Sequence, residues 1–212
     1  MDQVYMEGRL PWVRYVHQIS GALLAVFILL HLSNHLFALF GPNMHIQVMH
    51  LFRKLYRFPP IEGLLLVTVL TQIITGIGLA FHKWKNQPAM VKLQVASGLY
   101  LSLFLVYHLW AIIMARFVWL IDSDFFFASA GLQAGPSAYF FFPYYSLAVF
   151  STFVHIATIH YNKSMHALQL KQAAAPDLKR IKRQTSGILL AGLLVTTLIM
   201  LGLCGYRLFS DI

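Results

Sequence analysis

Residues Ser20–His31 read SGALLAVFILLH, and residues Ser97–His108 read SGLYLSLFLVYH. Each stretch is a Ser-Gly pair, nine mostly apolar residues and a histidine, and the second begins 77 residues after the first. Both lie inside longer apolar runs that have the length of a helix crossing a bilayer, which takes about 20 residues. The repeat therefore predicts two membrane-spanning helices that carry a histidine at the same depth.

The rest of the chain has the same apolar character. Apolar residues make up 58% of the 212 residues and charged residues only 11%, whereas an ordinary soluble domain has about 25% charged residues. Five stretches have the length of a membrane span, near residues 15–40, 60–82, 94–119, 139–161 and 186–207. Lipid offers no partners for unpaired backbone groups, so such spans fold as helices. The sequence predicts an all-α fold, an integral membrane bundle of five transmembrane helices forming a single domain over residues 1–212.

The net charge of +9 follows the connections between these spans. Eleven of the 16 Lys and Arg residues fall at the N-terminus, between the second and third spans, or between the fourth and fifth. Positively charged connections stay on the cytoplasmic side, so we expect a cytoplasmic N-terminus and a C-terminus on the outer side. We expect residues 120–138 to form an outer-face loop lying partly in the interface. The charge is explained without nucleic acid, and the connection at 162–184 is a candidate surface for an acidic partner.

Three of the ten histidines, His31, His108 and His155, fall well inside apolar stretches, where an ionisable side chain is costly and indicates a function. Eleven residues at about 100° each advance about 20° beyond three full turns. Ser20 and His31 therefore share one helix face, as do Ser97 and His108. If the repeats enter the membrane at equal depth, His31 and His108 lie level on parallel helices. This is the arrangement that an axial pair on haem iron requires.

Four other histidines stand at or beyond the ends of the expected spans, and we expect them to face solvent or headgroups: His45, His50, His82 and His166. His155 lies late in the fourth span, nearer the cytoplasm. A second haem there needs a level partner on the second span, whose interior offers only Gln72, a poor haem ligand. Three alternatives stay open for His155: a five-coordinate haem, a pair with another residue, or a structural role.

Other classes of protein fit the sequence less well. A desaturase-type di-iron site needs clustered HxxHH elements, which the sequence lacks, and a transporter reading is weakened because no Asp, Glu, Lys or Arg stands in mid-span. The single cysteine, Cys204, excludes a Cys-based metal cluster. A non-catalytic membrane assembly or interaction subunit without haem, whose histidines cross-link helices, remains an alternative.

The joint pattern resembles the membrane-anchor cytochrome b subunit of succinate dehydrogenase and quinol:fumarate reductase, in its single-chain, five-helix form, over nearly the whole chain. HQISGALLAVFILLH (17–31) resembles the first helix of that family, and LQVASGLYLSLFLVYH (93–108) resembles the third. TFVHIATIHY (152–161) resembles the fourth, and LKRIKRQTSGILLAGLL (178–194) resembles the basic lead into the last helix.

In that family the first and third helices hold one haem b, and the second and fourth hold another. The resemblance thus implies His31 and His108 as ligands of an outer-side haem and His155 as a ligand of an inner one. The second span departs from the family pattern because it has no interior histidine. The resemblance also implies that Ser20 hydrogen-bonds a quinone carbonyl and that His17 meets a haem propionate or the quinone.

The implied function is electron transfer for an oxidoreductase of the tricarboxylic acid cycle in a bacterial inner membrane. The haem would relay electrons between the quinone pool and flavoprotein and iron–sulfur subunits on the cytoplasmic face. The chain has no flavin or iron–sulfur motif, so we expect no dicarboxylate-converting site on it. A free-standing membrane cytochrome b is the related alternative.

Overall fold

The computed structural model describes residues 11–83, 87–133, 135–171 and 177–205, without the side chains of His82 and Lys83. Within these residues the chain forms seven α-helices and no strand. Five segments are long and apolar enough to cross a membrane: Pro11–Phe40, Pro59–Phe81, Ala89–Val118, Gly135–Gln169 and Leu178–Leu203. The predicted all-α fold with five spans is confirmed. The predicted sides of the two chain ends and the position of the His82 side chain fall outside the described part.

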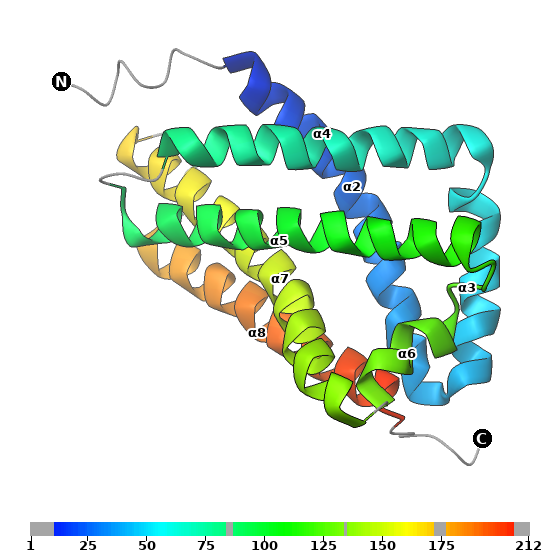
Figure 1. The fold of residues 1–212 in the computed structure, drawn as a ribbon. Helices are drawn as coiled ribbons and strands as arrows, with labels where there is room; N and C mark the ends of the chain where they lie inside the picture. The colour runs from blue at the N-terminus through cyan, green and yellow to red at the C-terminus, as the bar shows by residue number, and fades with distance from the viewer. Residues whose placement is uncertain (1–10, 84–86, 134, 172–176, 206–212) are drawn as a thin grey trace.

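The helices follow one another with short connections. In chain order they are α2 (Pro11–Leu36), α3 (Pro42–Tyr56), α4 (Pro59–Lys83), α5 (Ala89–Ile113), α6 (Phe125–Gln133), α7 (Ala138–Gln169) and α8 (Leu178–Leu203). Short 3-10 segments at Phe37–Phe40 and Gly135–Ser137 and a π-helical turn at Met114–Val118 extend them. The short helices α3 and α6 lie at one end of the long helices (Figure 1). We call this the capped end, and the end where α4 leads to α5 and α7 leads to α8 the open end.

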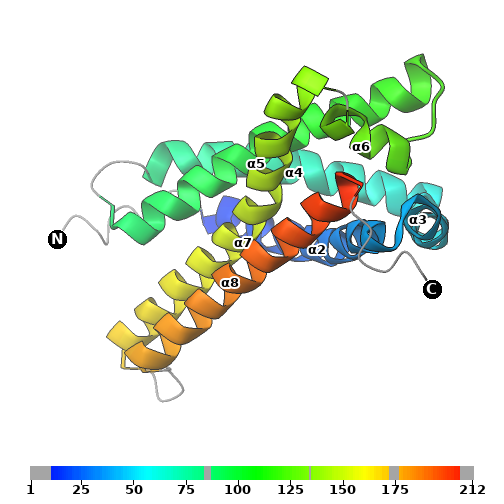
Figure 2. The same ribbon diagram turned by 90° about the horizontal axis from the view of Figure 1, so that it is seen from below.

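The first six helices form two units of the same design, each with a long helix, a short helix and a long returning helix. The first unit is α2, α3 and α4, and the second is α5, α6 and α7. In each unit the two long helices pack against each other, and α4 packs on α5 to join the units. α8 runs beside α7 and also contacts α2 (Figure 2). The repeat in the sequence is therefore a repeat in the structure, because its two copies lie on the first helix of each unit.

Helix starts are encoded locally. α3 begins after Gly41, whose φ of 98° is a conformation that favours glycine, and Pro42 occupies the first helical position, where no backbone N–H is needed. Pro59 opens α4 in the same way. The Asp177 carboxylate caps α8 by accepting a hydrogen bond from the backbone N–H of Arg180 at 2.7 Å.

The capped end differs from the sequence prediction, which left residues 41–59 as a connection and 120–138 as a loop. Both contain a helix, α3 and α6, too short to cross a membrane. Each helix buries residues at helical spacing: His45, Met49 and Arg53 on α3, and Phe125, Ser129 and Leu132 on α6. The two short helices thus lie across the ends of the spans and shield the interior of the bundle there.

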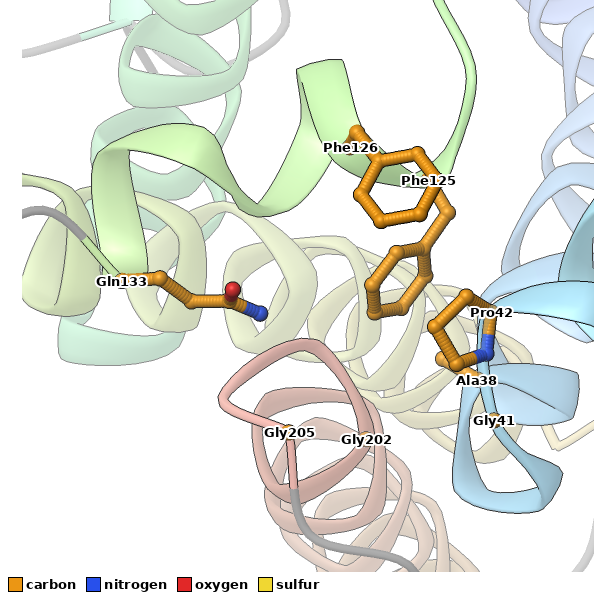
Figure 3. Close-up of a pocket in the computed structure, with 8 residues that line it drawn as sticks. All are labelled: Ala38, Gly41, Pro42, Phe125, Phe126, Gln133, Gly202 and Gly205. Carbon is orange, nitrogen blue, oxygen red and sulfur yellow. The ribbon is translucent and has the colours of Figure 1, made fainter.

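The C-terminal part of α8 completes the capped end. Gly202 lies so close to the backbone of Ala38 that a Cβ would come within 2.9 Å of it. Beside this contact lies a cavity of about 230 Å³ (Figure 3), lined by Ala38, Gly41, Pro42, Phe125, Phe126, Gln133, Gly202 and Gly205. The Gln133 side-chain amide already donates to the carbonyl oxygen of Leu203 at 3.0 Å. The cavity therefore offers a mostly apolar surface.

Candidate functional site

His31 on α2 and His108 on α5 face each other inside the bundle, near the capped end. Their ring centres are 5.9 Å apart and their ring planes make an angle of 71°. Phe27 stacks on His31 with ring centres 5.5 Å apart, and Phe104 stacks on His108 at 5.2 Å. Phe104 also follows Phe27 by 77 residues. The repeat therefore includes a stacked Phe–His pair, and the two pairs meet at the same level.

The two histidines meet through their side chains, because α2 and α5 do not pack against each other along their length. Each of these helices packs on α4 instead. The contact between His31 and His108 is thus a contact between the two units, and not between two helices of one unit.

His35, one turn after His31, extends the pair into a chain of imidazoles. Its Nε2 lies 3.3 Å from Nε2 of His31, and its Nδ1 lies 3.3 Å from Nε2 of His45 on α3. We expected His45 to face solvent, and this expectation is wrong, because only 1% of its surface is exposed. The signal that sequence reasoning missed is the spacing of His45 and Met49 on one face of an amphipathic helix.

Asn34 forms the far end of this chain. Its Nδ2 donates to Nε2 of His45 at 3.1 Å, whereas its Oδ1 and the Nδ1 of His45 are buried without a hydrogen-bond partner. Burial lowers the pKa of His45 to about 4; the charge of Asp124 opposes this shift and the charge of Arg53 adds to it. The His45 ring is therefore neutral at pH 7, with one N–H donor and one acceptor nitrogen.

Arg53 fixes α3 in place. Its Nη1 donates to both carboxylate oxygens of Asp122 at 2.7 and 2.9 Å, and its Nη2 donates to the carbonyl and hydroxyl oxygens of Ser123 at 2.9 and 3.2 Å. Asp122 and Ser123 belong to the connection between α5 and α6. The helix that carries His45 is thus tied to the segment that follows the helix carrying His108.

The Ser-Gly pair of α2 lies toward the open end and is held within its own unit. Gln72 on α4 donates from Nε2 to Oγ of Ser20 at 2.9 Å and to the carbonyl oxygen of His17 at 2.6 Å. Ser20 donates its own proton to the carbonyl oxygen of Val16 at 2.8 Å. Nδ1 of His17 lies 2.8 Å from Oγ1 of Thr75. Ser20 and His17, the two residues expected near a quinone, therefore have partners inside the bundle.

The Ser-Gly pair of α5 is held in a similar way by His155 on α7. Nδ1 of His155 lies 3.0 Å from the carbonyl oxygen of Gln94 and 3.3 Å from Oγ of Ser97. A Cβ on Gly98 would lie 3.0 Å from Cε1 of His155, so the glycine permits the close approach of the ring. His155 thus contacts the serine of the Ser-Gly pair and a nearby carbonyl oxygen in the second unit, as Gln72 does in the first. Among the described side chains of α4 there is no histidine to face it.

The side chains around His31 and His108 limit which kind of metal site they could form. Across the described part of the chain, no three His, Cys, Asp or Glu side chains are grouped to hold a metal ion. Two facing imidazoles instead match a metal that takes one nitrogen on each side and its other ligands from a macrocycle. The ring centres are 5.9 Å apart, which allows such a pair, but Nε2 of His31 lies 3.3 Å from Nε2 of His35, so binding of a metal through Nε2 would require His31 to exchange that contact.

Comparison of the chain with protein-family models, with curated proteins and with solved structures finds no match.

Proposed function

We propose that this protein is a haem b-binding membrane subunit that relays electrons between the quinone pool and a cytoplasmic module of the succinate dehydrogenase or fumarate reductase type. The observation that carries the proposal is the meeting of His31 and His108 between the two repeated units, with ring centres 5.9 Å apart. Bound haem would supply reversible one-electron transfer.

The roles of the surrounding residues follow from their contacts. His31 and His108 would hold the haem iron through imidazole nitrogens. Phe27 and Phe104 hold these rings in place by stacking on them. The short helices α3 and α6, which cover the capped end, would keep water away from the centre.

We place the protein in a bacterial inner membrane, with its N-terminus and open end on the cytoplasmic side and the histidine pair in the outer half. Basic residues support this orientation, because positive connections stay cytoplasmic. Six Lys and Arg residues on α7, α8 and the segment between them are exposed there: Lys163, Lys171, Lys179, Arg180, Lys182 and Arg183. Such a surface suits the docking of acidic flavoprotein and iron–sulfur partner subunits.

The quinone is proposed as the substrate at the open-end half, near Ser20 and His17. A quinone carbonyl accepts hydrogen bonds and needs a donor. Ser20 has a single hydroxyl proton, which it gives to Val16, so binding of the carbonyl would require Ser20 to exchange this partner. His155 stays a candidate for a second haem, because its contacts with Gln94 and Ser97 both use Nδ1 and leave Nε2 outside them.

The alternative is a membrane assembly subunit without haem, and one observation favours it. His31, His35 and His45 already hydrogen-bond one another across two helices, as cross-linking residues would. A free-standing cytochrome b differs from the proposal only in lacking partner subunits.

Spectroscopy of the purified protein separates these functions. The full chain, isolated from membranes in detergent, should show the reduced-minus-oxidised absorption bands of low-spin haem b. His31→Ala and His108→Ala should each abolish that signal, whereas His50→Ala, a change at an exposed histidine of α3, should leave it intact. A full signal in both variants would exclude the ligand pair, and wild-type protein without haem would favour the assembly subunit.

A further inference from the structure

The short helix α3 is held along the membrane surface by the two spans that it connects. The first span ends at Phe40 and the second begins at Pro59, so one residue precedes α3 and two follow it. Consecutive spans run in opposite directions, so both ends of α3 stand at the same face of the membrane. With 15 residues, α3 is about 22 Å long. Its axis therefore runs along that face, across the direction of α4 and α5 (Figure 1).

Three ridges of side chains follow α3, one buried, one polar and exposed, and one apolar and exposed. The buried ridge is His45, Met49 and Arg53, the polar ridge is Asn43, Gln47, His50 and Lys54, and the apolar ridge is Met44, Leu51 and Leu55. At about 100° per residue, the centre of the apolar ridge lies about 90° from that of the polar ridge and about 140° from that of the buried ridge. The pattern is that of a helix with three different neighbours.

The buried ridge fixes the rotation of α3 about its axis. Arg53 donates from Nη1 to both carboxylate oxygens of Asp122 at 2.7 and 2.9 Å, and turning the helix would break these bonds. The apolar ridge consequently points away from the bundle, with Met44, Leu51 and Leu55 exposed by 40%, 61% and 53%. It needs a neighbour that the described part of the chain does not supply.

Lipid is the neighbour that this position favours. The exposed apolar surface of α4, which faces acyl chains, begins at Leu64, nine residues after Leu55. A second copy of the chain would need a surface of about 800 Å² on each partner, and three half-exposed side chains offer a much smaller area. The polar ridge, which carries Lys54 and His50, borders the apolar ridge and suits headgroups and water.

We propose that α3 is an interfacial helix docked on the lipid leaflet at the capped end. The apolar ridge enters the acyl chains, and the polar ridge stays among the headgroups. Amphipathic helices of this kind bury their apolar face about 5–10 Å into the boundary between headgroups and acyl chains. Docking sets the depth of the capped end in the membrane, because Arg53 ties α3 to the connection between α5 and α6. The inference does not depend on the proposed function.

Spin labels on neighbouring positions of α3 test this docking in the full chain, reconstituted into lipid bilayers. Single cysteines would be introduced as Leu51→Cys and Leu55→Cys on the apolar ridge and as Gln47→Cys and Lys54→Cys on the polar ridge, each together with Cys204→Ser. All four positions on α3 are exposed, so the labels leave the buried ridge unchanged. Electron paramagnetic resonance then measures collisions with oxygen, which concentrates among acyl chains, and with a nickel chelate, which stays in water.

Docking predicts opposite results for the two ridges. Labels at Leu51 and Leu55 should collide more with oxygen than with the chelate, at a depth of about 5–10 Å. Labels at Gln47 and Lys54 should show the reverse order. Leu70→Cys, at an exposed position of α4 inside its span, is the control for full lipid exposure.

Two results would overturn the docking. If the chelate reaches Leu55→Cys as readily as its neighbour Lys54→Cys, α3 lies in water. If neither reagent reaches the apolar ridge while both polar positions stay accessible, protein covers the ridge, and line broadening between labels of different molecules would identify a second copy. Neither result bears on the proposed haem ligands, which the absorption spectra test separately.

Discussion

The two halves of the bundle use the same repeat in opposite ways. Toward the open end, each Ser-Gly pair is satisfied inside its own unit, by Gln72 in the first and by His155 in the second. Toward the capped end, the repeated histidines reach out of their units and meet each other. The repeat thus places the same serine and histidine in both units. Which partner each side chain contacts depends on whether the neighbouring helix offers a polar group.

The largest effect expected from this comparison is on haem content. Replacing His108 by Ala should remove all bound haem, whereas His155→Ala should leave it unchanged, because no described side chain of α4 offers a histidine opposite His155. Haem-to-protein stoichiometry of the two purified variants checks this. Loss of half of the haem from His155→Ala would mean that the open half holds a second haem, and the contrast between the halves would be lost.

The next effect is a dependence of stability on pH that belongs to the capped half. Folding lowers the pKa of His45 from its ordinary 6.5 to about 4. As pH falls from 6.5 to 4, the unfolded chain binds a proton at this ring and the folded protein does not. The free energy of unfolding therefore decreases as the pH is lowered, by about 3 kcal/mol between pH 6.5 and pH 4.

Thermal unfolding in detergent between pH 7 and pH 4 measures this dependence. Other groups titrate in the same window, so the difference between wild type and His45→Gln isolates the contribution of His45. Identical pH profiles for the two proteins would show that His45 is not held neutral by burial.

A smaller contrast compares the polar contacts that anchor each half. Arg53→Leu removes charge-assisted bonds to Asp122, which is itself partly exposed, and should cost about 2–3 kcal/mol. Gln72→Leu removes neutral bonds inside the membrane-spanning part and should cost about 1 kcal/mol. Unfolding midpoints of both variants test the order, with the exposed neighbour Lys54→Leu as the control for Arg53. Equal losses would contradict a stronger anchor at the capped end.

The smallest expected effect compares the glycines of the two repeats. A Cβ at Gly98 would come within 3.0 Å of the His155 ring, and a Cβ at Gly21 within 2.9 Å of the end of the Gln72 side chain. The ring is held by two contacts and cannot move aside as easily as a flexible glutamine. Gly98→Ala should therefore destabilise by about 1 kcal/mol, with a smaller effect for Gly21→Ala.

Gly63→Ala is the control for this pair, because nothing lies within 4 Å of a Cβ there. It should stabilise α4 by up to about 1 kcal/mol through helix propensity. If Gly98→Ala also proved stabilising, the close approach of His155 would not matter to the fold.

Sequence patterns predicted much of the fold because membrane spans are encoded locally. The five spans follow from apolar runs of sufficient length, although α8 begins at Leu178, before the predicted span near 186–207. The short helices α3 and α6 were missed, since neither has the length of a span and each is recognisable only by one buried face. Missing α3 meant misplacing His45, which joins the site from that helix.

The sequence by itself determined that the chain crosses the membrane as helices, because the length and apolar content of the spans can be taken directly from it. It also determined that Ser20 and His31, like Ser97 and His108, share a helix face, because the helical period depends only on their spacing. The tertiary structure decided that His31 meets His108, that His155 turns to Ser97, and that His45 is buried beside His35. These contacts join residues from 10 to 77 positions apart in the chain. A helical period fixes the face on which a side chain lies, whereas packing of distant helices fixes what stands opposite that face.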